Sequence, residues 1–359
     1  MSRILEIDLE TVSHNVKVLK KFTGKKILAC VKSDGYGIGA IPVSKKIEKT
    51  VDWFGVATID EGISLRKAGI IKPILVLGAS LQPDVRKAID YRVSLTAADA
   101  SFIRNIINAK GLSIHLKMDT GMGRIGIMPE EVSNVMNVIK NSKGIKLEGI
   151  FSHLATSESM DRRYAIKQIE IFKKVIAGLP AKLRGITHIA NSGGIVNLPE
   201  SIKGFSMVRT GLLLYGVYPS LFLKIFKSIP NLKYALKGTA QILSIRKVPA
   251  GTRISYGGTF VCKHDTTIAI AGIGYADGLN RALSNRFYMK HNEQLIPVRG
   301  NICMDQTVVE LREEARKGDQ LIFLDQQISV EDMAEICSTV PHAIMTGFGV
   351  SRLRKVYHG

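Results

Sequence analysis

The feature that most constrains the fold is an alternation of short apolar runs with helical segments over the first two-thirds of the chain. The segments Ile59–Lys67, Pro129–Lys140 and Arg162–Ile176 place apolar residues at helical spacing. Such alternation predicts a parallel sheet, because each parallel crossover needs a helix. The predicted strands are Lys26–Val31, Trp53–Ala57, Ile74–Leu77, Val93–Thr96, Ile114–Met118, Leu147–Phe151, Thr187–Ala190 and Met207–Val208. Eight strands in about 230 residues predict a (β/α)8 TIM-type barrel, with a doubly wound open sheet as the alternative.

The pattern changes after residue 232 to strands joined by short turns, with one helix predicted at Val330–Ile336. The strands predicted there are Ala240–Val248, Thr266–Gly272, Gln294–Arg299, Thr307–Leu311 and Gln320–Leu324. We therefore expect two domains, a barrel over residues 1–232 and a mostly-β C-terminal domain over residues 233–359. Residues 1–9 begin with a strand-like alternation and could pair with the C-terminal domain.

Composition, cysteine spacing and net charge limit the compartment and the partners that we expect for this protein. No apolar run reaches the roughly 18 residues that span a bilayer, and acids occupy the place of a signal peptide's apolar stretch. The four cysteines form no CxxC and lie at no metal spacing, so we expect reduced thiols, no metal and a cytoplasmic protein without membrane contact. The net charge of +19 comes from scattered lysines, which favours a solvated surface over nucleic-acid binding. Steep salt dependence would be the signature of nucleic-acid binding.

Lys32 is the most informative residue for chemistry. It ends the apolar run Ile27–Val31 and opens a glycine-rich turn, SDGYG. An amine at the mouth of a buried strand is desolvated, which suits Schiff-base chemistry. Taken alone, a lysine that extends from a strand end into solvent is the simpler interpretation.

Other polar groups follow the later barrel strands, where active sites of such barrels lie. Asp119 and Arg124 follow the fifth strand, His153 follows the sixth, and the segments Asn191–Gly194 and Arg209–Gly211 follow the seventh and eighth. Loops after the last two strands often bind phosphate, and small residues there admit close backbone N–H groups. Each glycine alone could mark only a tight turn. Combined with the lysine, this pattern predicts pyridoxal 5′-phosphate.

Seven segments, in order, resemble those of the alanine racemase family, fold-type III pyridoxal-phosphate enzymes. They are VKSDGYGIG, HLKMDTGMGRIG, HIANSGG, VRTGLLLYGVYPS, ISYGGTF, GIGYADGLNR and RGNICMDQTVVEL, and the similarity covers nearly the whole chain. The resemblance implies interconversion of L- and D-alanine by two bases, supplying D-alanine for peptidoglycan. Lys32 would hold the cofactor and act on one face of the α-carbon, and Tyr256 on the other. His153 and Arg209 would provide an electropositive, hydrogen-bonded neighbourhood.

The resemblance also assigns binding residues. The phosphate would be bound by Tyr36, Ser192, Gly211 and Leu212. Arg209 would face the pyridine nitrogen of the cofactor. Because a guanidinium always donates, that nitrogen would stay unprotonated and the ring would be a weaker electron sink. A weaker electron sink favours return of the proton over decarboxylation.

The substrate carboxylate would meet Arg124, Met304 and Asp305, and Arg124 would also contact the cofactor phenolate. Lys117 matches a lysine that is carbamylated in many members. In the family Tyr256, Met304 and Asp305 come from the partner, which implies a head-to-tail homodimer with shared active sites. Asp277 and Tyr275 would lie near the entrance.

Two departures leave alternatives open. Ile38 replaces a histidine of the lysine motif, and Ser351 aligns with a gate tyrosine that contacts the phosphate in many relatives. A wider entrance would suit a serine or broad-specificity racemase. A fold-type III decarboxylase would carry an acid in place of Arg209. A non-catalytic pyridoxal-phosphate carrier would lack both Tyr256 and the second domain.

Overall fold

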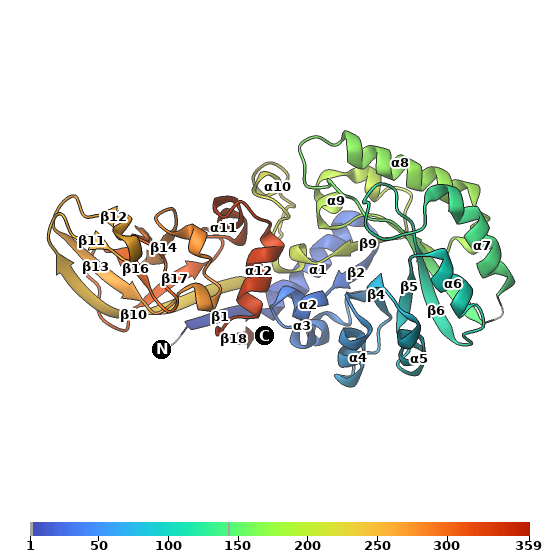
Figure 1. Cartoon of the computed structure of the whole chain (residues 1–359), viewed down its shortest axis with the longest axis horizontal. Coiled ribbons are helices and arrows are strands. Elements are labelled where there is room, and N and C mark those ends of the chain that lie inside the picture. Colours follow the sequence, from blue (N-terminus) through green and yellow to red (C-terminus); the bar gives the residue numbers. More distant parts are fainter. Residues whose placement is uncertain (1–2, 143) are drawn as a thin grey trace.

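The computed structural model describes residues 3–142 and 144–359 and has two parts that lie side by side (Figure 1). One part is a ring of eight parallel strands. These strands are β2 (Lys26–Cys30), β3 (Trp53–Val56), β4 (Ile74–Ala79), β5 (Ser94–Ala97), β6 (Leu112–Lys117), β7 (Ile145–Phe151), β8 (Ile186–His188) and β9 (Met207–Thr210). Each differs from its predicted range by at most a few residues at an end.

The eight strands pair in chain order from β2 to β8, and β9 pairs back onto β2. Two hydrogen bonds link the β8 segment to β9 and complete the ring: Ser206 N–H to Thr187 O at 2.9 Å and Arg209 N–H to Ala190 O at 3.0 Å. The predicted barrel is therefore confirmed, and the open doubly wound sheet is excluded.

Helical segments follow the strands, and the longer ones cover the outside of the ring. They are α1 (Leu9–Thr23), α2 (Lys32–Tyr36), α3 (Ala40–Ile47), α4 (Ile59–Lys67), α5 (Gln82–Asp90), α6 (Ala100–Ile106), α7 (Val132–Asn141), α8 (Arg163–Gly178), α9 (Ser192–Asn197) and α10 (Leu221–Phe226). Asp8, Thr58 and Asp99 cap three of them by accepting a backbone N–H, which explains where these helices begin. Each longer helix buries one apolar face against the strands.

The second part is a mostly-β structure built around the long strand β10 (Leu236–Val248). Its other strands are β1 (Arg3–Asp8), β11 (Arg253–Ile254), β12 (Phe260–Val261), β13 (Thr266–Ala271), β14 (Tyr288–His291), β15 (Gln294–Pro297), β16 (Thr307–Glu310), β17 (Gln320–Leu324) and β18 (Arg354–His358). β1 pairs antiparallel with β10 and parallel with β18. Residues 1 and 2 lie outside the described residues. The expected boundary at residue 232 falls between α10 and β10.

The described residues of this second part form two α-helices, α11 (Val330–Ile336), which was predicted, and α12 (Pro341–Gly349), which was not. α12 contains two glycines near its end and begins at Pro341, so its local pattern gives little helical signal. It packs against α2, and a Cβ on Gly37 would lie 2.7 Å from Cα of Gly349. Figure 1 shows α12 at the junction of the two parts, next to α2 of the barrel.

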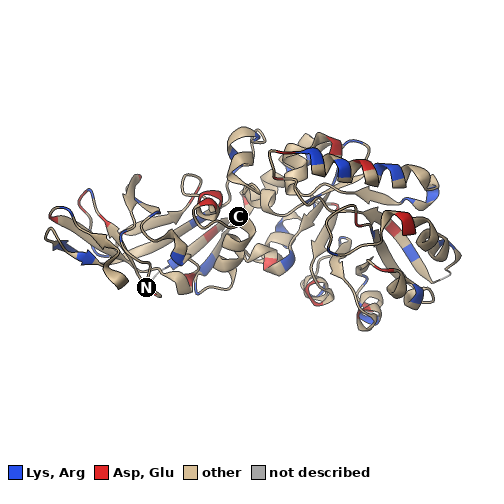
Figure 2. Cartoon of the chain, turned by 45° about the horizontal axis from the view of Figure 1, so that its top comes forward, with Lys and Arg blue, Asp and Glu red and all other residues tan. Residues whose placement is uncertain are grey.

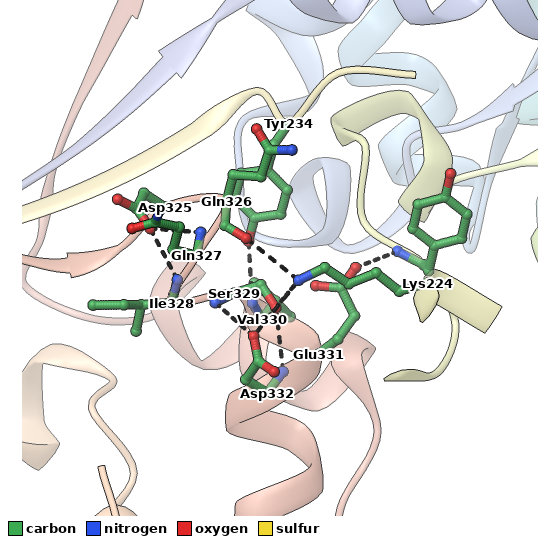
Figure 3. Close-up of polar contacts among 11 residues, drawn as sticks. Lys224, Tyr234, Asp325, Gln326, Gln327, Ile328, Ser329, Val330, Glu331 and Asp332 are labelled. Atoms are coloured by element: carbon green, nitrogen blue, oxygen red, sulfur yellow. Dashed lines mark hydrogen bonds and ion pairs between the residues drawn. The ribbon is translucent and has the colours of Figure 1, made fainter. Parts of the chain in front are cut away.

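Polar contacts tie α11 to the segment after β9 (Figure 3). Buried Glu331 accepts the Tyr218 N–H at 2.7 Å through Oε1, and its Oε2 has no partner within the described residues. Lys224 Nζ donates to Ser329 Oγ at 2.6 Å, and Tyr234 Oη accepts the Val330 N–H at 3.1 Å. This junction fixes the loop after β9, which forms part of the cavity wall described below.

Surface charge is mixed. Figure 2 shows lysines and arginines along α8 and over the C-terminal sheet, interspersed with acids and not gathered into one stripe. Among residues 3–142 and 144–359, no helix has both the length and the apolar character to cross a bilayer.

Candidate active site

Lys32 opens an unusual turn at the carboxyl end of β2. Ser33, Asp34, Gly35, Tyr36 and Gly37 all have positive φ, from 52° to 83°, so the chain makes a left-handed turn here. Side chains other than glycine pay roughly 1–2 kcal/mol each in this region. Such strain persists only where surrounding contacts hold it.

Three contacts brace this turn. Tyr215 Oη donates to Gly35 O at 2.7 Å, from a fully buried ring. Ser33 N–H donates to Glu61 Oε1 at 2.9 Å, and Ala40 N–H donates to Asp34 Oδ1 at 2.8 Å. The turn therefore presents the Lys32 amine and the Tyr36 ring in fixed positions.

Both side chains line one cavity of about 470 Å³ at the carboxyl ends of the strands. It lies within the size range of small-molecule sites. Other predicted residues share it: Lys117, Arg124, His153, Ser192, Arg209 and Gly211. The described part of the chain offers no hydrogen-bond partner to Lys32 Nζ or Tyr36 Oη, so an amine and a hydroxyl face the cavity free.

One end of the cavity is built to accept an anion. Gly211 N–H donates to Ser192 Oγ at 3.3 Å, and Ser192 lies in the first turn after β8. A Cβ on Gly211 would lie 2.2 Å from Oη and 2.4 Å from two ring carbons of Tyr36, so only glycine lets this side chain lie here. Burial raises the pKa of Tyr36 well above its usual value, so its hydroxyl is a donor.

Arg209 lies at the base of the cavity, 3% exposed, and has no carboxylate partner within the described residues. Its guanidinium donates to His188 Nδ1 at 2.8 Å, His153 Nδ1 at 3.0 Å and Ser152 O at 2.8 Å. Burial lowers the pKa of Arg209 to about 10, which still leaves it charged at neutral pH. Burial and the nearby Arg209 charge lower the pKa of His153 well below its usual value.

Two buried histidines near Arg209, His188 and His115, were not predicted from the sequence. Because Arg209 can only donate, His188 accepts at Nδ1 and carries its proton on Nε2, which lies 3.1 Å from His115 Nδ1. Burial lowers the pKa of His115 to about 4, so both rings are neutral donors and acceptors in series. His115 lies two residues before Lys117 on β6, and this period-two spacing is the signal that could have revealed it.

Lys117 is 3% exposed, and its Nζ lies 4.9 Å from the centre of the Phe151 ring. Burial, followed by the charges of Arg209 and Arg124, lowers its pKa to about 7. Asp119 does not enter this chemistry directly. Its carboxylate accepts N–H groups of Gly121, Met122 and Arg124 at 2.7–3.0 Å, which shapes the loop that carries Arg124.

Four predicted residues do not line this cavity within one chain, three of them in the C-terminal part. Tyr256 is 72% exposed and Met304 is 53% exposed, both in the C-terminal part. Asp305 is half-exposed and accepts from Arg352 Nη2 at 2.6 Å. Leu212 follows Gly211 directly, but its side chain is fully buried and does not line the cavity.

The residues expected near the entrance, Asp277, Tyr275 and Ser351, do not line the Lys32 cavity either. Asp277 is fully buried and accepts from Arg3 at 2.6 Å and from Arg352 at 3.0 Å, so it braces β1 and the C-terminal segment. Ser351 donates to Phe348 O at 2.6 Å and lines a separate groove with Tyr275. Within one chain, Ser351 therefore does not line the Lys32 cavity.

The donor set fits pyridoxal 5′-phosphate. The free lysine amine matches the aldehyde of the cofactor. The glycine-dependent cradle with two hydroxyls matches its phosphate, and the buried guanidinium without a carboxylate partner matches its ring nitrogen. The barrel and this cavity define a class, the barrel enzymes that use pyridoxal phosphate.

Comparisons with known proteins specify the family. Family models of the alanine racemase N-terminal and C-terminal domains match residues 7–219 and 235–357. "Alanine racemase 2" of Caldanaerobacter subterraneus subsp. tengcongensis is 37% identical over 98% of this chain and 94% of its own length. The chain therefore belongs to the alanine racemase family and is a pyridoxal-phosphate-dependent isomerase.

Solved structures of alanine racemases share this fold. The alanine racemase of E. faecalis superposes with a TM-score of 0.90 at 32% identity, over 99% of this chain and 98% of that one. The alanine racemase of Bartonella henselae, which holds covalently bound pyridoxal phosphate, gives a TM-score of 0.88 at 27% identity over both full chains. The names of these relatives favour alanine over a broader substrate range.

Proposed function

We propose that this chain interconverts L- and D-alanine with two bases on opposite faces of the α-carbon, one of them supplied by a partner subunit. The observation that carries the proposal is the single cavity in which an unpartnered lysine amine, a phosphate-sized cradle and a buried arginine face one another. Pyridoxal 5′-phosphate, when bound, withdraws electrons from the α-carbon of an attached amino acid and makes its proton acidic.

Within the cavity, Lys32 Nζ would hold the cofactor covalently and, once released, take or return a proton on one face. Tyr36, Ser192 and the backbone of Gly211 and Leu212 would bind the phosphate. Arg209 would donate to the ring nitrogen, and its hydrogen bonds to neutral His188 and His153 fix its orientation. A donor at this position keeps electron withdrawal moderate, which favours proton transfer over decarboxylation.

The second base would be Tyr256 of the partner subunit, acting on the other face. Its exposure, and that of Met304, supports this arrangement because neither reaches the Lys32 cavity of its own chain. In a head-to-tail homodimer these residues, with Asp305, would complete the partner's cavity and its carboxylate site. Arg124 would bind the substrate carboxylate from the barrel side.

Lys117 would act as a carbamate. With a pKa of about 7, a substantial fraction of Lys117 is neutral at neutral pH, and a neutral amine can add carbon dioxide with release of one proton. The product is an anion beside Arg124 and Arg209. That anion would offset the cluster of positive charge and orient Arg124.

The cellular role would be supply of D-alanine for peptidoglycan by a cytoplasmic enzyme that binds neither membrane nor nucleic acid. Four free cysteines support a reducing compartment, and the interspersed surface charge argues against a nucleic-acid groove.

The test is exchange of the α-proton of L-alanine in D2O by the cofactor-loaded enzyme, with the chirality of the product followed and L-serine measured in parallel. Deuterated D-alanine with slow serine turnover is the expected result. Fast serine turnover would move the assignment to a broad racemase, and absence of exchange would refute the racemase function.

A further inference from the structure

Arg352 has no role in the proposed reaction, yet its guanidinium holds two carboxylates at once. It lies between α12 and β18, at the junction of the two parts of the chain (Figure 1). Its Nε donates to Asp277 Oδ1 at 3.0 Å, and its Nη2 donates to Asp305 Oδ1 at 2.6 Å. Arg352 therefore joins the end of α12 to the loop that carries Met304 and Asp305.

Asp277 fixes one end of this contact. Its side chain is fully buried, and its Oδ2 accepts from Arg3 Nη1 at 2.6 Å and from the Gly274 N–H at 3.0 Å. A buried carboxylate is stable only when it is paired and hydrogen-bonded, so Asp277 holds the guanidinium of Arg352 in one place. The fork of an arginine leaves further N–H groups for a second acceptor, and that acceptor is Asp305.

The backbone next to Asp305 is attached to the turn that carries Asp277. The Ala276 N–H donates to Met304 O at 3.0 Å, so the carbonyl of Met304 is fixed from one side while Arg352 holds Asp305 from the other. Within residues 3–142 and 144–359, the Met304 N–H has no hydrogen-bond acceptor, and the residue is 53% exposed. The chain therefore offers an unpaired N–H from a braced loop at an exposed residue.

The ion pair between Arg352 and Asp305 acts on position more than on stability. The two side chains are 48% and 49% exposed, and ion pairs between such side chains contribute little to the free energy of unfolding. Without Arg352, however, the Asp305 carboxylate would lie uncompensated at a site that receives another carboxylate. Like charges at close range repel, so Asp305 would turn away and displace the adjacent Met304 N–H.

We infer that Arg352 is a positioning residue for the substrate carboxylate site of the partner subunit, and not for the site of its own chain. The inference rests on the proposed function, in which Met304 and Asp305 complete the partner's cavity. The competing outcome is an effect on the chain's own site, because α12, which ends three residues before Arg352, packs against α2 and its Lys32 turn.

Hybrid dimers separate the two outcomes. A Lys32→Ala chain is paired with a Tyr256→Phe chain, so that the one intact site takes Met304 and Asp305 from the first chain and its lysine from the second. Arg352→Met is then placed on either chain, and the kinetics of L-alanine are measured with the cofactor bound. We expect KM for L-alanine to rise about tenfold, the lower end of the range for a hydrogen bond to a charged group, only when the substitution lies on the Lys32→Ala chain. The value of kcat should change much less, because a bond to the substrate carboxylate is present in both the ground state and the transition state.

Two further substitutions serve as controls. Arg354→Met removes the same charge from an exposed residue two positions along the chain, and it should leave KM unchanged on either chain. Arg352→Lys keeps the charge but cannot hold two carboxylates in a fork, so it should give a smaller rise in KM with the same dependence on the chain. It also carries the test if Arg352→Met fails to fold.

A second readout needs no turnover. In protein labelled with ¹⁵N-methionine, the amide resonance of Met304, assigned by its absence in Met304→Leu, should shift in Arg352→Met and stay in place in Arg354→Met. An equal rise in KM for both placements, a rise confined to the Tyr256→Phe chain, or no rise in either would overturn the inference. A hybrid that lacks activity before Arg352 is changed would instead refute the shared site of the proposed function.

Discussion

Replacement of Gly211 by alanine tests the anion cradle most sharply. The added methyl would come within 3.0 Å of Oη, Cζ and Cε2 of Tyr36. The two nearest ring carbons would lie 2.4 Å from the methyl, and carbon atoms pack at about 3.5–4.0 Å, so the ring must retreat by at least about 1 Å. Overpacking of this kind costs about 1–3 kcal/mol in the free energy of unfolding. The backbone at Gly211 has negative φ, so the effect is steric and not conformational.

The same displacement should weaken the cofactor. A hydrogen bond from Tyr36 to an anionic phosphate contributes about 1.5–3 kcal/mol, which corresponds to roughly a tenfold to hundredfold rise in the dissociation constant for pyridoxal 5′-phosphate. Absorbance titration of the apoprotein measures this constant, and urea unfolding measures stability. Gly178→Ala is the matched control, because nothing lies within 4 Å of a Cβ at that position.

A coupling measurement identifies the route of the effect. If Gly211→Ala acts through Tyr36, its effect on cofactor affinity should shrink strongly in a Tyr36→Phe background. Unchanged stability and affinity in Gly211→Ala, or fully additive losses in the double variant, would refute the reasoning.

Three further predictions concern other groups. Tyr256→Phe should slow α-proton removal from L-alanine far more than from D-alanine, and equal losses in D2O exchange would contradict its role as a face-specific base. Because the neutral amine of Lys117 is lost below about pH 7, the carbamate ¹³C signal from ¹³CO2 should fade as the pH drops through that value and be missing in Lys117→Ala. Burial raises the pKa of Glu331, so the native state holds this proton more tightly than the unfolded state and loses stability as the pH rises past the usual glutamate range. Glu331→Gln should therefore raise the melting temperature at pH 8 but not at pH 4, and a gain of equal size at both values would contradict this account.

Much of the barrel could be predicted because its strands are short apolar runs buried on both sides, a pattern that local sequence records directly. The lysine at the end of β2 and the small residues near Gly211 could be located for the same reason, since strand ends in a parallel barrel share one face. The turn after Lys32 was expected to be rich in glycine. Its left-handed course through Ser33 and Asp34 was not predictable, because those conformations are imposed by Tyr215 and Glu61 from distant segments.

Features that depend on tertiary contacts were missed. α12 is a helix because it packs on the Lys32 turn, and its own residues give a weak signal. The contacts of His188 and Arg352 arise only once the strands and the two parts of the chain are placed. The absence of Tyr256 from the cavity lining of its own chain agrees with its expected place in a partner's site, but that expectation came from the family resemblance and not from any local pattern.

The most direct test of the shared active site is complementation between two inactive variants. Lys32→Ala and Tyr256→Phe chains, carrying different affinity tags, are co-expressed and the hybrid dimer is purified through both tags. If each site takes its lysine from one chain and its tyrosine from the other, one of the two sites is intact and activity should reach about half that of the wild type. An inactive hybrid, from chains that still form dimers and bind the cofactor, would contradict the account.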